Sequence, residues 1–201
     1  MDSREYILNS IRRHTTERYD KPDLSPLEAE AITYDDPVAQ FTAAMKQQGG
    51  RVVLLQPGQT VGAAIAAAFP DARRTVLAVR DLPGADELPG EVTFADDIPE
   101  ARDINGADLG VAEGLMGVCE NGAVWIEQSV KHRAVYLLPE ALVFIVRRDA
   151  LVNNMHEAYN RLGDRAPHFG AFISGPSKTA DIEQALVFGA HGARDVTVLL
   201  V

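Results

Sequence analysis

The fold class follows from residues 51–79, RVVLLQPGQTVGAAIAAAFPDARRTVLAV, which predict a strand, a helix and a second strand in that order. Arg51 to Leu55 form a short apolar run rich in β-branched residues, as is typical of a buried strand. After a Pro57–Gly58 turn, Thr60 can cap an alanine-rich helix suited to close packing on a sheet. Thr75 to Val79 form the second strand. This order predicts parallel strands with helices on both faces of the sheet.

The rest of the chain extends this pattern into an α/β fold with a mostly parallel sheet flanked by helices. Further strands are predicted at residues 91–95, 108–112, 123–128, 133–138, 142–146, 171–174 and 196–201, and further helices at 3–18, 37–48, 153–162 and 181–188. Residues 19–36 lack strong periodicity and contain Pro22 and Pro26, so they read either as a linker that wraps the core or a neighbouring subunit, or as a floppy tail. We therefore predict a helical N-terminal arm over residues 1–36 and one domain over residues 37–201.

Composition excludes several classes of protein. The chain has 201 residues, a formal net charge of −10 and a single cysteine, Cys119, which cannot form an internal disulfide or hold an iron–sulfur cluster alone. Its acidity opposes binding to nucleic acid, whose affinity for proteins rests on Lys and Arg. No apolar run reaches the ~20 residues that a membrane span needs, and the first residues lack a signal-peptide pattern. We expect a cytoplasmic protein with no nucleic-acid partner and no membrane span.

The segment from Gly175 to Asp181 predicts an anion site. A strand, the turn Gly175-Pro176-Ser177-Lys178-Thr179 and then a helix would place free backbone N–H groups beside two hydroxyls and an ammonium. Asp181 would be the N-cap of that helix, with Gln184 as its capping-box partner. The alternative is a plain turn before a helix. The segment lacks the Gly-Lys junction of a P-loop, and no dinucleotide-binding glycine pattern follows a strand.

A second candidate segment is Cys119 to Gly122, just before the strand predicted at 123–128. Asn121-Gly122 is a turn signal that would present Glu120 at a loop tip, where a carboxylate can act as nucleophile or general base. Glu120 is therefore a candidate catalytic residue, with Asn121 and Gly122 as candidate ligand contacts. The alternative is a solvated Glu120 on an ordinary turn. Cys119 has no activating neighbour in the sequence and is interpreted as structural.

Charged residues give weaker signals. Arg133, beside Lys131 and His132, could bind a ligand carboxylate through paired hydrogen bonds or pair with acidic side chains. Residues 80–113 contain ten acidic residues and two arginines, which predicts a solvated rim or a surface for a basic protein. The five histidines lack metal-ligand spacing, so no metal site is predicted, and His191 is assigned to the C-terminus of the helix predicted at 181–188.

The two candidate segments together resemble the LUD domain family of lactate utilization proteins. The family's closing pattern appears as Ser174 to Glu183, followed by Gly189 and His191-Gly192. Its middle signature aligns with Cys119 to Ala123, although Asn121 and Ala123 replace two threonines, and Arg133 and Pro139 fit the stretch that follows. The resemblance covers roughly residues 37–201.

This resemblance implies a fold similar to the NagB/RpiA/CoA-transferase superfamily and a place in a three-component system that oxidises L-lactate to pyruvate. In such systems the iron–sulfur clusters lie on the other two proteins, so none is expected on this chain. We expect a subunit that binds a small carboxylate or a phosphate-bearing ligand, with the iron–sulfur proteins as partners; a second copy of the chain is a further candidate partner. Two alternatives stay open. Glu120-Asn121-Gly122 also resembles the E-N-G motif of CoA transferases, which suggests acyl transfer, and the arm suggests a non-catalytic assembly factor.

Overall fold

The computed structural model describes the chain except residues 1, 16, 18, 21, 24, 164, 166–168, 183 and 184, and it describes only the backbone of residues 28, 180–182, 185 and 186. It divides into two compact units, residues 1–31 and 32–201. The first unit holds the helices α1 (Ser3–His14), capped by Asp2, and α2 (Ser25–Ala29). The described part of the chain contains no helix with the length and apolarity needed to span a bilayer.

The second unit is built on a six-stranded, fully parallel sheet with the order β1-β12-β7-β4-β2-β3. Its strands are β1 (Arg51–Leu54), β2 (Arg74–Leu77), β3 (Glu91–Phe94), β4 (Leu109–Gly114), β7 (Ala141–Val146) and β12 (Asp195–Leu200). The α/β fold class and all six of these strands were predicted. The runs of β2, β4, β7 and β12 are buried because the sheet is covered on both faces. The strand predicted as buried at 51–55 is instead the edge strand β1, which has no fully buried residue and leaves Leu54 40% exposed.

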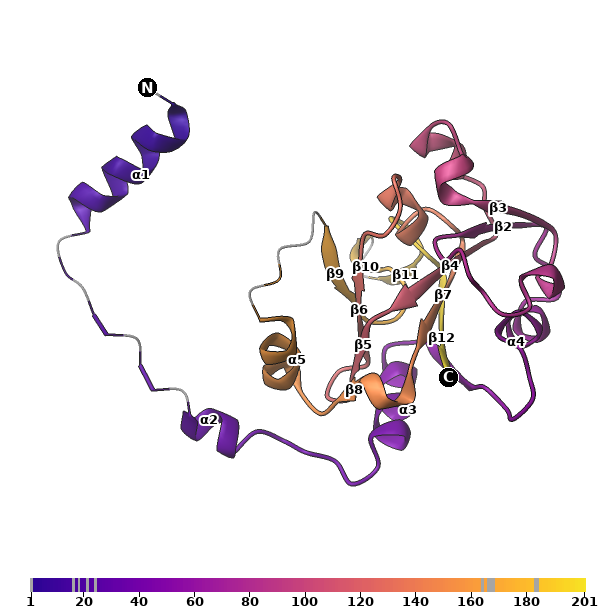
Figure 1. The fold of residues 1–201 in the computed structure, drawn as a ribbon, viewed down its shortest axis with the longest axis horizontal. Coiled ribbons are helices and arrows are strands. Elements are labelled where there is room, and N and C mark those ends of the chain that lie inside the picture. The colour runs from indigo at the N-terminus through magenta and orange to yellow at the C-terminus, as the bar shows by residue number, and fades with distance from the viewer. Residues whose placement is uncertain are drawn as a thin grey trace. The chain divides into compact units, whose positions relative to one another are not determined.

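A second sheet covers one face of the parallel sheet. Its order is β8-β5-β6-β9, made of β5 (Met116–Val118), β6 (Ala123–Glu127), β8 (Leu151–Val152) and β9 (Gly170–Ile173). Side chains alternate along β6, so that Val124 and Ile126 pack toward the parallel sheet while Ala123 and Trp125 pack in the cluster that includes α5 (Met155–Leu162). Figure 1 shows the resulting layers in the order α5, four-stranded sheet, parallel sheet and α4.

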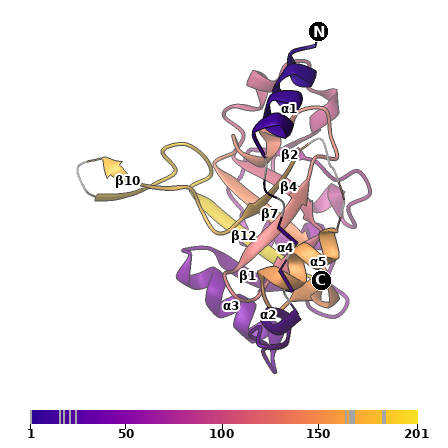
Figure 2. The same cartoon turned by 90° about the vertical axis from the view of Figure 1, so that its left-hand side faces the viewer.

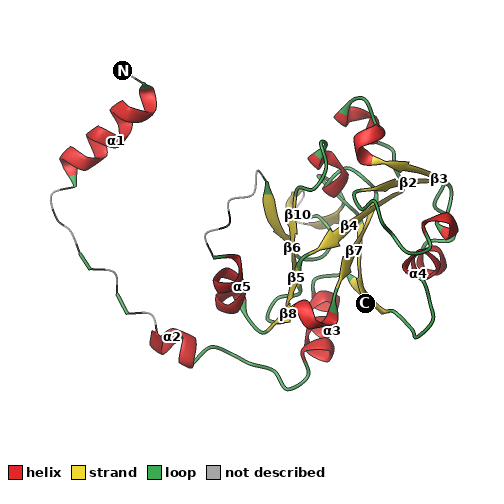
Figure 3. Cartoon of the chain, viewed as in Figure 1, coloured by secondary structure: helices red, strands yellow, loops and turns green. Residues whose placement is uncertain are grey.

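Helices cover the remaining surfaces of the sheets, as Figure 3 shows in red. On the far face of the parallel sheet, α4 (Val61–Ala68) buries Ala64 and Ile65 and is capped by the Thr60 hydroxyl, as predicted. On the near face, α3 (Pro37–Gln47) buries Phe41 and Met45 against the core. Asp36 caps α3 by accepting a hydrogen bond from Ala39 N.

Two predicted elements are wrong. The segment predicted as a helix at 181–188 forms an antiparallel hairpin of β10 (Lys178–Ile182) and β11 (Ala185–Phe188). Its two ends are pinned together, since Gly189 N donates to Ser177 O and Ser177 N donates to Ala193 O. The chain therefore runs out and back, and the ribbon of β10 stands clear of the sheets in Figure 2.

The strand predicted at 133–138 is instead the 3₁₀ turn η4 (Arg133–Tyr136). Both edges of the preceding strand β6 are already paired, with β5 and β9, so this segment cannot form a hairpin with β6. The turn buries Val135 and Tyr136 and leaves Leu137 exposed. Among the described residues, four further short 3₁₀ turns connect strands: η1 (Ala85–Glu87), η2 (Ala95–Asp97), η3 (Ala101–Ile104) and η5 (Arg148–Ala150).

Candidate functional site

The segment that follows β9 is fixed by close contacts with Gln48 and by backbone bonds to Gly189 and Ala193, and it does not lead into a helix. Gly175 has φ +69°, and a Cβ there would lie 2.6 Å from Gln48 O, so the close approach of the two backbones requires glycine. Ser177 then bonds through its backbone to Gly189 and Ala193. The residues around Ser177 and those around Gly192 are thus brought together.

These two stretches line one cavity of about 290 Å³, which we call the motif cavity. Its lining residues are Phe172 to Gly175, Ser177, His191 to Ala193, Tyr136 of η4 and the following Leu137, and Leu142 and Val196 near the starts of β7 and β12. Most of this lining is apolar. The polar side chains are Ser174, Ser177 and His191, apart from the Tyr136 hydroxyl, which bonds to Ser129.

The structure revises the predicted anion site. Gly175 and Ser177 line the motif cavity, but no helix begins after Thr179, so the expected helix dipole is absent there. Lys178 bonds to Gln48 Oε1 at 3.2 Å, and Thr179 pairs with Val187 in the hairpin. Asp181 lies in β10 and cannot be a helix N-cap. Gln184, its predicted box partner, and Glu183, the end of the closing pattern, lie outside the described residues.

The Asn121-Gly122 turn forms as predicted, between β5 and β6. Gly122 has φ +68° and donates from its N–H to Val118 O at 2.9 Å, while Asn121 Oδ1 accepts from Ala123 N. Asn121 O also accepts a 2.7 Å hydrogen bond from the Ser174 hydroxyl. This bond joins the two sequence segments that carry the family resemblance, although neither Asn121 nor Gly122 lines the motif cavity.

Glu120 serves the start of helix α5. One of its carboxylate oxygens accepts a 3.0 Å hydrogen bond from Met155 N, in the first turn of α5, and its own N–H donates to Asn153 O. A carboxylate at a helix N-terminus is stabilised by the helix dipole. Glu120 is not among the residues that line the motif cavity. The geometry therefore accounts for this carboxylate as a helix cap.

Cys119 is buried, in agreement with its structural interpretation. Its side chain is fully covered and lies 3.3 Å from Pro37 O. Burial, with a smaller contribution from the nearby Glu157 carboxylate, raises the pKa of the thiol from its ordinary 9.0 to about 11, against a hydrogen bond from the backbone of Phe41. The thiol is therefore neutral at physiological pH and a poor nucleophile.

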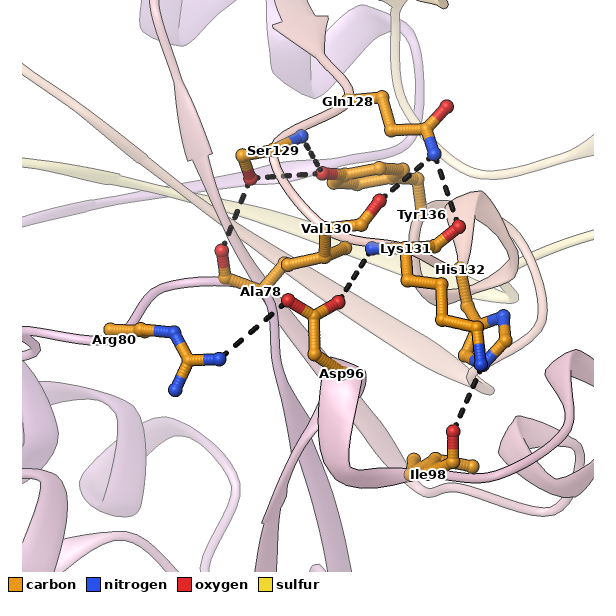
Figure 4. Close-up of polar contacts among 10 residues, drawn as sticks. All are labelled: Ala78, Arg80, Asp96, Ile98, Gln128, Ser129, Val130, Lys131, His132 and Tyr136. Carbon is orange, nitrogen blue, oxygen red and sulfur yellow. Dashed lines mark hydrogen bonds and ion pairs between the residues drawn. The ribbon is translucent and has the colours of Figure 1, made fainter.

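The basic residues predicted around Arg133 follow β6 in a tightly held loop, residues 128–132 (Figure 4). Lys131 N donates to Asp96 Oδ1 at 2.5 Å, and His132 Nε2 lies 2.9 Å from Ile98 O, which can only accept. Gln128 closes the loop by donating to Val130 O and Lys131 O. These hydrogen bonds therefore fix the backbone from which the Lys131 and His132 side chains extend, directly before Arg133.

Lys131, His132 and Arg133 line a second cavity of about 510 Å³, which we call the basic cavity. Its other lining residues are Ala101, Gln128, Ala134, Leu137 and Leu138, and none of them is acidic. The Arg133 guanidinium carbon lies 5.6 Å from the centre of the Phe169 ring, a cation–π distance. Leu137 lines both the basic and the motif cavity, so the two share a wall.

Sequence reasoning assigned two cavity residues to other roles. His191 was assigned to the end of a helix that does not form, and it instead lines the motif cavity, as Ser177 does. Tyr136 was placed in a strand. The backbone bonds that join residues 177, 189 and 193 bring Ser177 and the His191 loop together, and the sequence carries no local signal for that. Among the described residues, no three His, Cys, Asp or Glu side chains converge on a metal site.

Comparison with known proteins identifies the family. A family model for the LUD domain matches residues 92–201, which include every lining residue given above for the motif and basic cavities. The chain belongs to the LUD domain family. A solved DUF162 family protein from Deinococcus radiodurans shares the fold, with a TM-score of 0.65 and 21% identity over 85% of this chain and 99% of that one.

Curated relatives match part of this chain. "Lactate utilization protein C" of Oceanobacillus iheyensis is 30% identical over 102 residues, 47% of this chain and 44% of that protein. "Lactate utilization protein C 1" of Bacillus mycoides is 38% identical over 93 residues, 43% of this chain and 40% of that protein. "Uncharacterized protein YkgG" of Escherichia coli is 33% identical over 102 residues, 47% and 44% of the two chains. The matches thus span less than half the length of these relatives.

Proposed function

We propose that this chain serves lactate utilization as a subunit that binds a small carboxylate or phosphate-bearing ligand at the motif and basic cavities. The observation that carries the proposal is the basic cavity: three consecutive basic residues line it, and none of its described lining residues is acidic, in a chain of net charge −10. Relatives named for lactate utilization supply the biological context.

The chemistry of the two cavities suits a ligand with one anionic end. Arg133 offers a planar fork of donors to a carboxylate or phosphate, and Lys131 adds a second positive charge. Beyond the shared wall at Leu137, Ser177 and His191 supply a hydroxyl and an imidazole inside a mostly apolar cavity. A small organic acid would place its anionic group on Arg133 and Lys131 and its remaining atoms against Leu137.

Oxidation of L-lactate to pyruvate releases two electrons and two protons, so the system needs an electron acceptor. This chain has one cysteine, which is buried and bonded toward Pro37, and a cluster takes about four cysteines. We therefore assign the iron–sulfur clusters to partner proteins and ligand binding to this chain.

Helix α1 offers a surface for those partners. Tyr6, Ile7 and Ile11 are 66%, 55% and 55% exposed, and no residue of α1 is buried. An apolar stripe of this kind on an amphipathic helix is a common docking element. This supports a second role as an assembly factor, in which the arm contacts the iron–sulfur proteins.

Ligand titration and growth test the proposal. Calorimetric titration with L-lactate, pyruvate and inorganic phosphate should show binding of at least one of them to the intact chain. Arg133→Ala should weaken that binding about tenfold or more, because a charge-assisted contact is lost. Arg102→Ala is the matched control, since this arginine is 86% exposed and lines neither cavity.

In a strain deleted for this chain, growth on L-lactate should fail, and the chain carrying Arg102→Ala should restore it better than the chain carrying Arg133→Ala. Normal growth of the deletion strain would contradict the role in lactate utilization. Equal binding by the two variants would contradict the site.

A further inference from the structure

A third cavity opens on the other face of the parallel sheet, where β2 and β4 part. The last paired residues of these strands are Leu77 and Val111, and Ala78 N donates to Val111 O before the chain turns away. β4 continues to Gly114, paired with β7 only. The edge of β4 beyond Val111 therefore has no strand on its β2 side.

This position is the topological switch point of the sheet. From β2 the chain leads outward to β3, and from β4 it leads through the four-stranded sheet to β7, on the opposite side. In open α/β sheets, ligands bind outside the carboxyl ends of strands at such a point. A cavity of about 470 Å³ lies there, and it shares no lining residue with the motif or basic cavity. We call it the switch cavity.

Four polar residues line the switch cavity: Arg80, Asp81, Glu113 and Ser129. The Arg80 guanidinium carbon lies 3.7 Å over the Phe94 ring, and one of its nitrogens lies 3.6 Å from Asp96 Oδ2 (Figure 4). Stacking fixes the guanidinium, and a single loose contact leaves most of its five N–H donors for a ligand. Ser129 donates to Ala78 O at 3.3 Å, which ties the loop 128–132 to the end of β2.

Glu113 is, like Asp81, a carboxylate of this cavity without a partner among the described residues. It lies near the end of the central strand β4, opposite Ile145 of β7, and within the described residues its carboxylate has no hydrogen bond or ion pair. Val61, Leu82 and Ile145 supply apolar walls. The Glu113 side chain is exposed, so its carboxylate is open to a ligand that carries a positive charge.

The charges on the lining decide the class of ligand. Two carboxylates, Glu113 and Asp81, line the cavity together with one guanidinium, so a simple acid would add negative charge to a lining that is already acidic on balance. A simple amine would leave the free donors of Arg80 unused. We propose that the switch cavity binds a small amino acid, with its carboxylate on Arg80, its ammonium group on Glu113 and its side chain against Leu82 and Ile145.

Saturation-transfer NMR on the full chain tests this proposal with three matched probes. L-Valine carries both charges, 2-hydroxy-3-methylbutanoate lacks the ammonium group, and isobutylamine lacks the carboxylate; the other standard amino acids complete the panel. At least one amino acid should bind, and the two matched probes should bind about tenfold more weakly or not at all. Failure of every amino acid, or equal binding of the three probes, would overturn the proposal.

Variants and shift mapping locate the site. Glu113→Gln and Arg80→Gln should each weaken amino-acid binding about tenfold, whereas Glu91→Gln, at the exposed start of β3, should not. Backbone shifts in the unaltered chain should move at residues 78–82 and 113, which requires no variant to fold. Shifts confined to Ser177 and His191 would overturn the site. Arg133→Ala should leave amino-acid binding intact, which separates this inference from the proposed function.

Discussion

At the scale of single residues, the buried thiol of Cys119 makes a pH prediction. Its pKa is raised from 9.0 to about 11 by burial, so the folded chain holds this proton more tightly than the unfolded chain does. The contribution of the thiol to stability is therefore complete below pH 9 and is lost as pH rises from 9 toward 11. Urea unfolding midpoints over this range should fall more steeply for the unaltered chain than for Cys119→Ala.

The same burial predicts low reactivity. At pH 8, iodoacetamide should modify Cys119 only after denaturant unfolds the chain, because the thiolate is scarce and covered in the folded state. Rapid labelling of the native chain, followed by intact mass, would contradict the structural role of this residue.

Glycine at residue 122 is needed for two reasons, which a matched pair of variants separates. Gly122 has φ +68°, and a Cβ there would lie 2.7 Å from Met45 N of α3. Gly58 has φ +79° but has no atom within 4 Å of an added Cβ. Gly58→Ala should therefore cost about 1 kcal/mol of unfolding free energy from backbone strain, and Gly122→Ala about 3 kcal/mol because overpacking is added. Equal costs in urea unfolding would contradict the close approach of this turn to α3.

At the scale of elements, Glu120 connects the β5–β6 turn to helix α5. Glu120→Ala removes a carboxylate that accepts from Met155 N, so we expect a loss of about 1 kcal/mol in unfolding free energy. Glu100→Ala is the control, because Glu100 precedes η3 without a side-chain capping bond, and it should leave stability nearly unchanged. Incubation with acyl-CoA esters should give no mass adduct. An adduct that Glu120→Gln abolishes would show that the carboxylate reacts, as the E-N-G resemblance suggests.

Elements with a strong local pattern were predictable, and elements set by distant contacts were not. Local sequence alone predicts the strands β1, β7 and β12, from their apolar runs, and the start of α4, from its Thr60 cap. Residues 181–188 have apolar spacing that suits a helix, but the bonds joining Ser177 to Gly189 and Ala193 impose a hairpin. Ser177 was predicted as a site residue because a helix was expected to begin after it, and that helix does not form. It lines the motif cavity because its backbone bonds to Gly189 and Ala193. His191 and Glu113 carry no local signal, because a pairing of loops places the first and a strand order places the second.

At the scale of the whole molecule, the division into two units shows which N-terminal residues a truncation should remove. Ile32 and Tyr34 belong to the second unit, where Asn154 Nδ2 donates to Ile32 O and Tyr34 N donates to Asn153 Oδ1. Asp36 caps α3 in the same unit. The informative truncation therefore removes residues 1–31, because a cut after residue 36 would also strip the cap of α3 and confuse loss of the arm with loss of stability.

We expect the chain 32–201 to fold with the melting temperature of the full chain and to keep the binding of L-lactate, pyruvate or phosphate shown by calorimetry. If α1 docks partner proteins through Tyr6, Ile7 and Ile11, capture of the iron–sulfur proteins by the truncated chain should fall. Replacing those three residues with serine in the full chain should have the same effect, while Arg12→Ser on the other side of α1 should not. Undiminished capture by both altered chains would place the partner surface on the LUD domain itself, and a lower melting temperature after truncation would mean that the arm stabilises that domain.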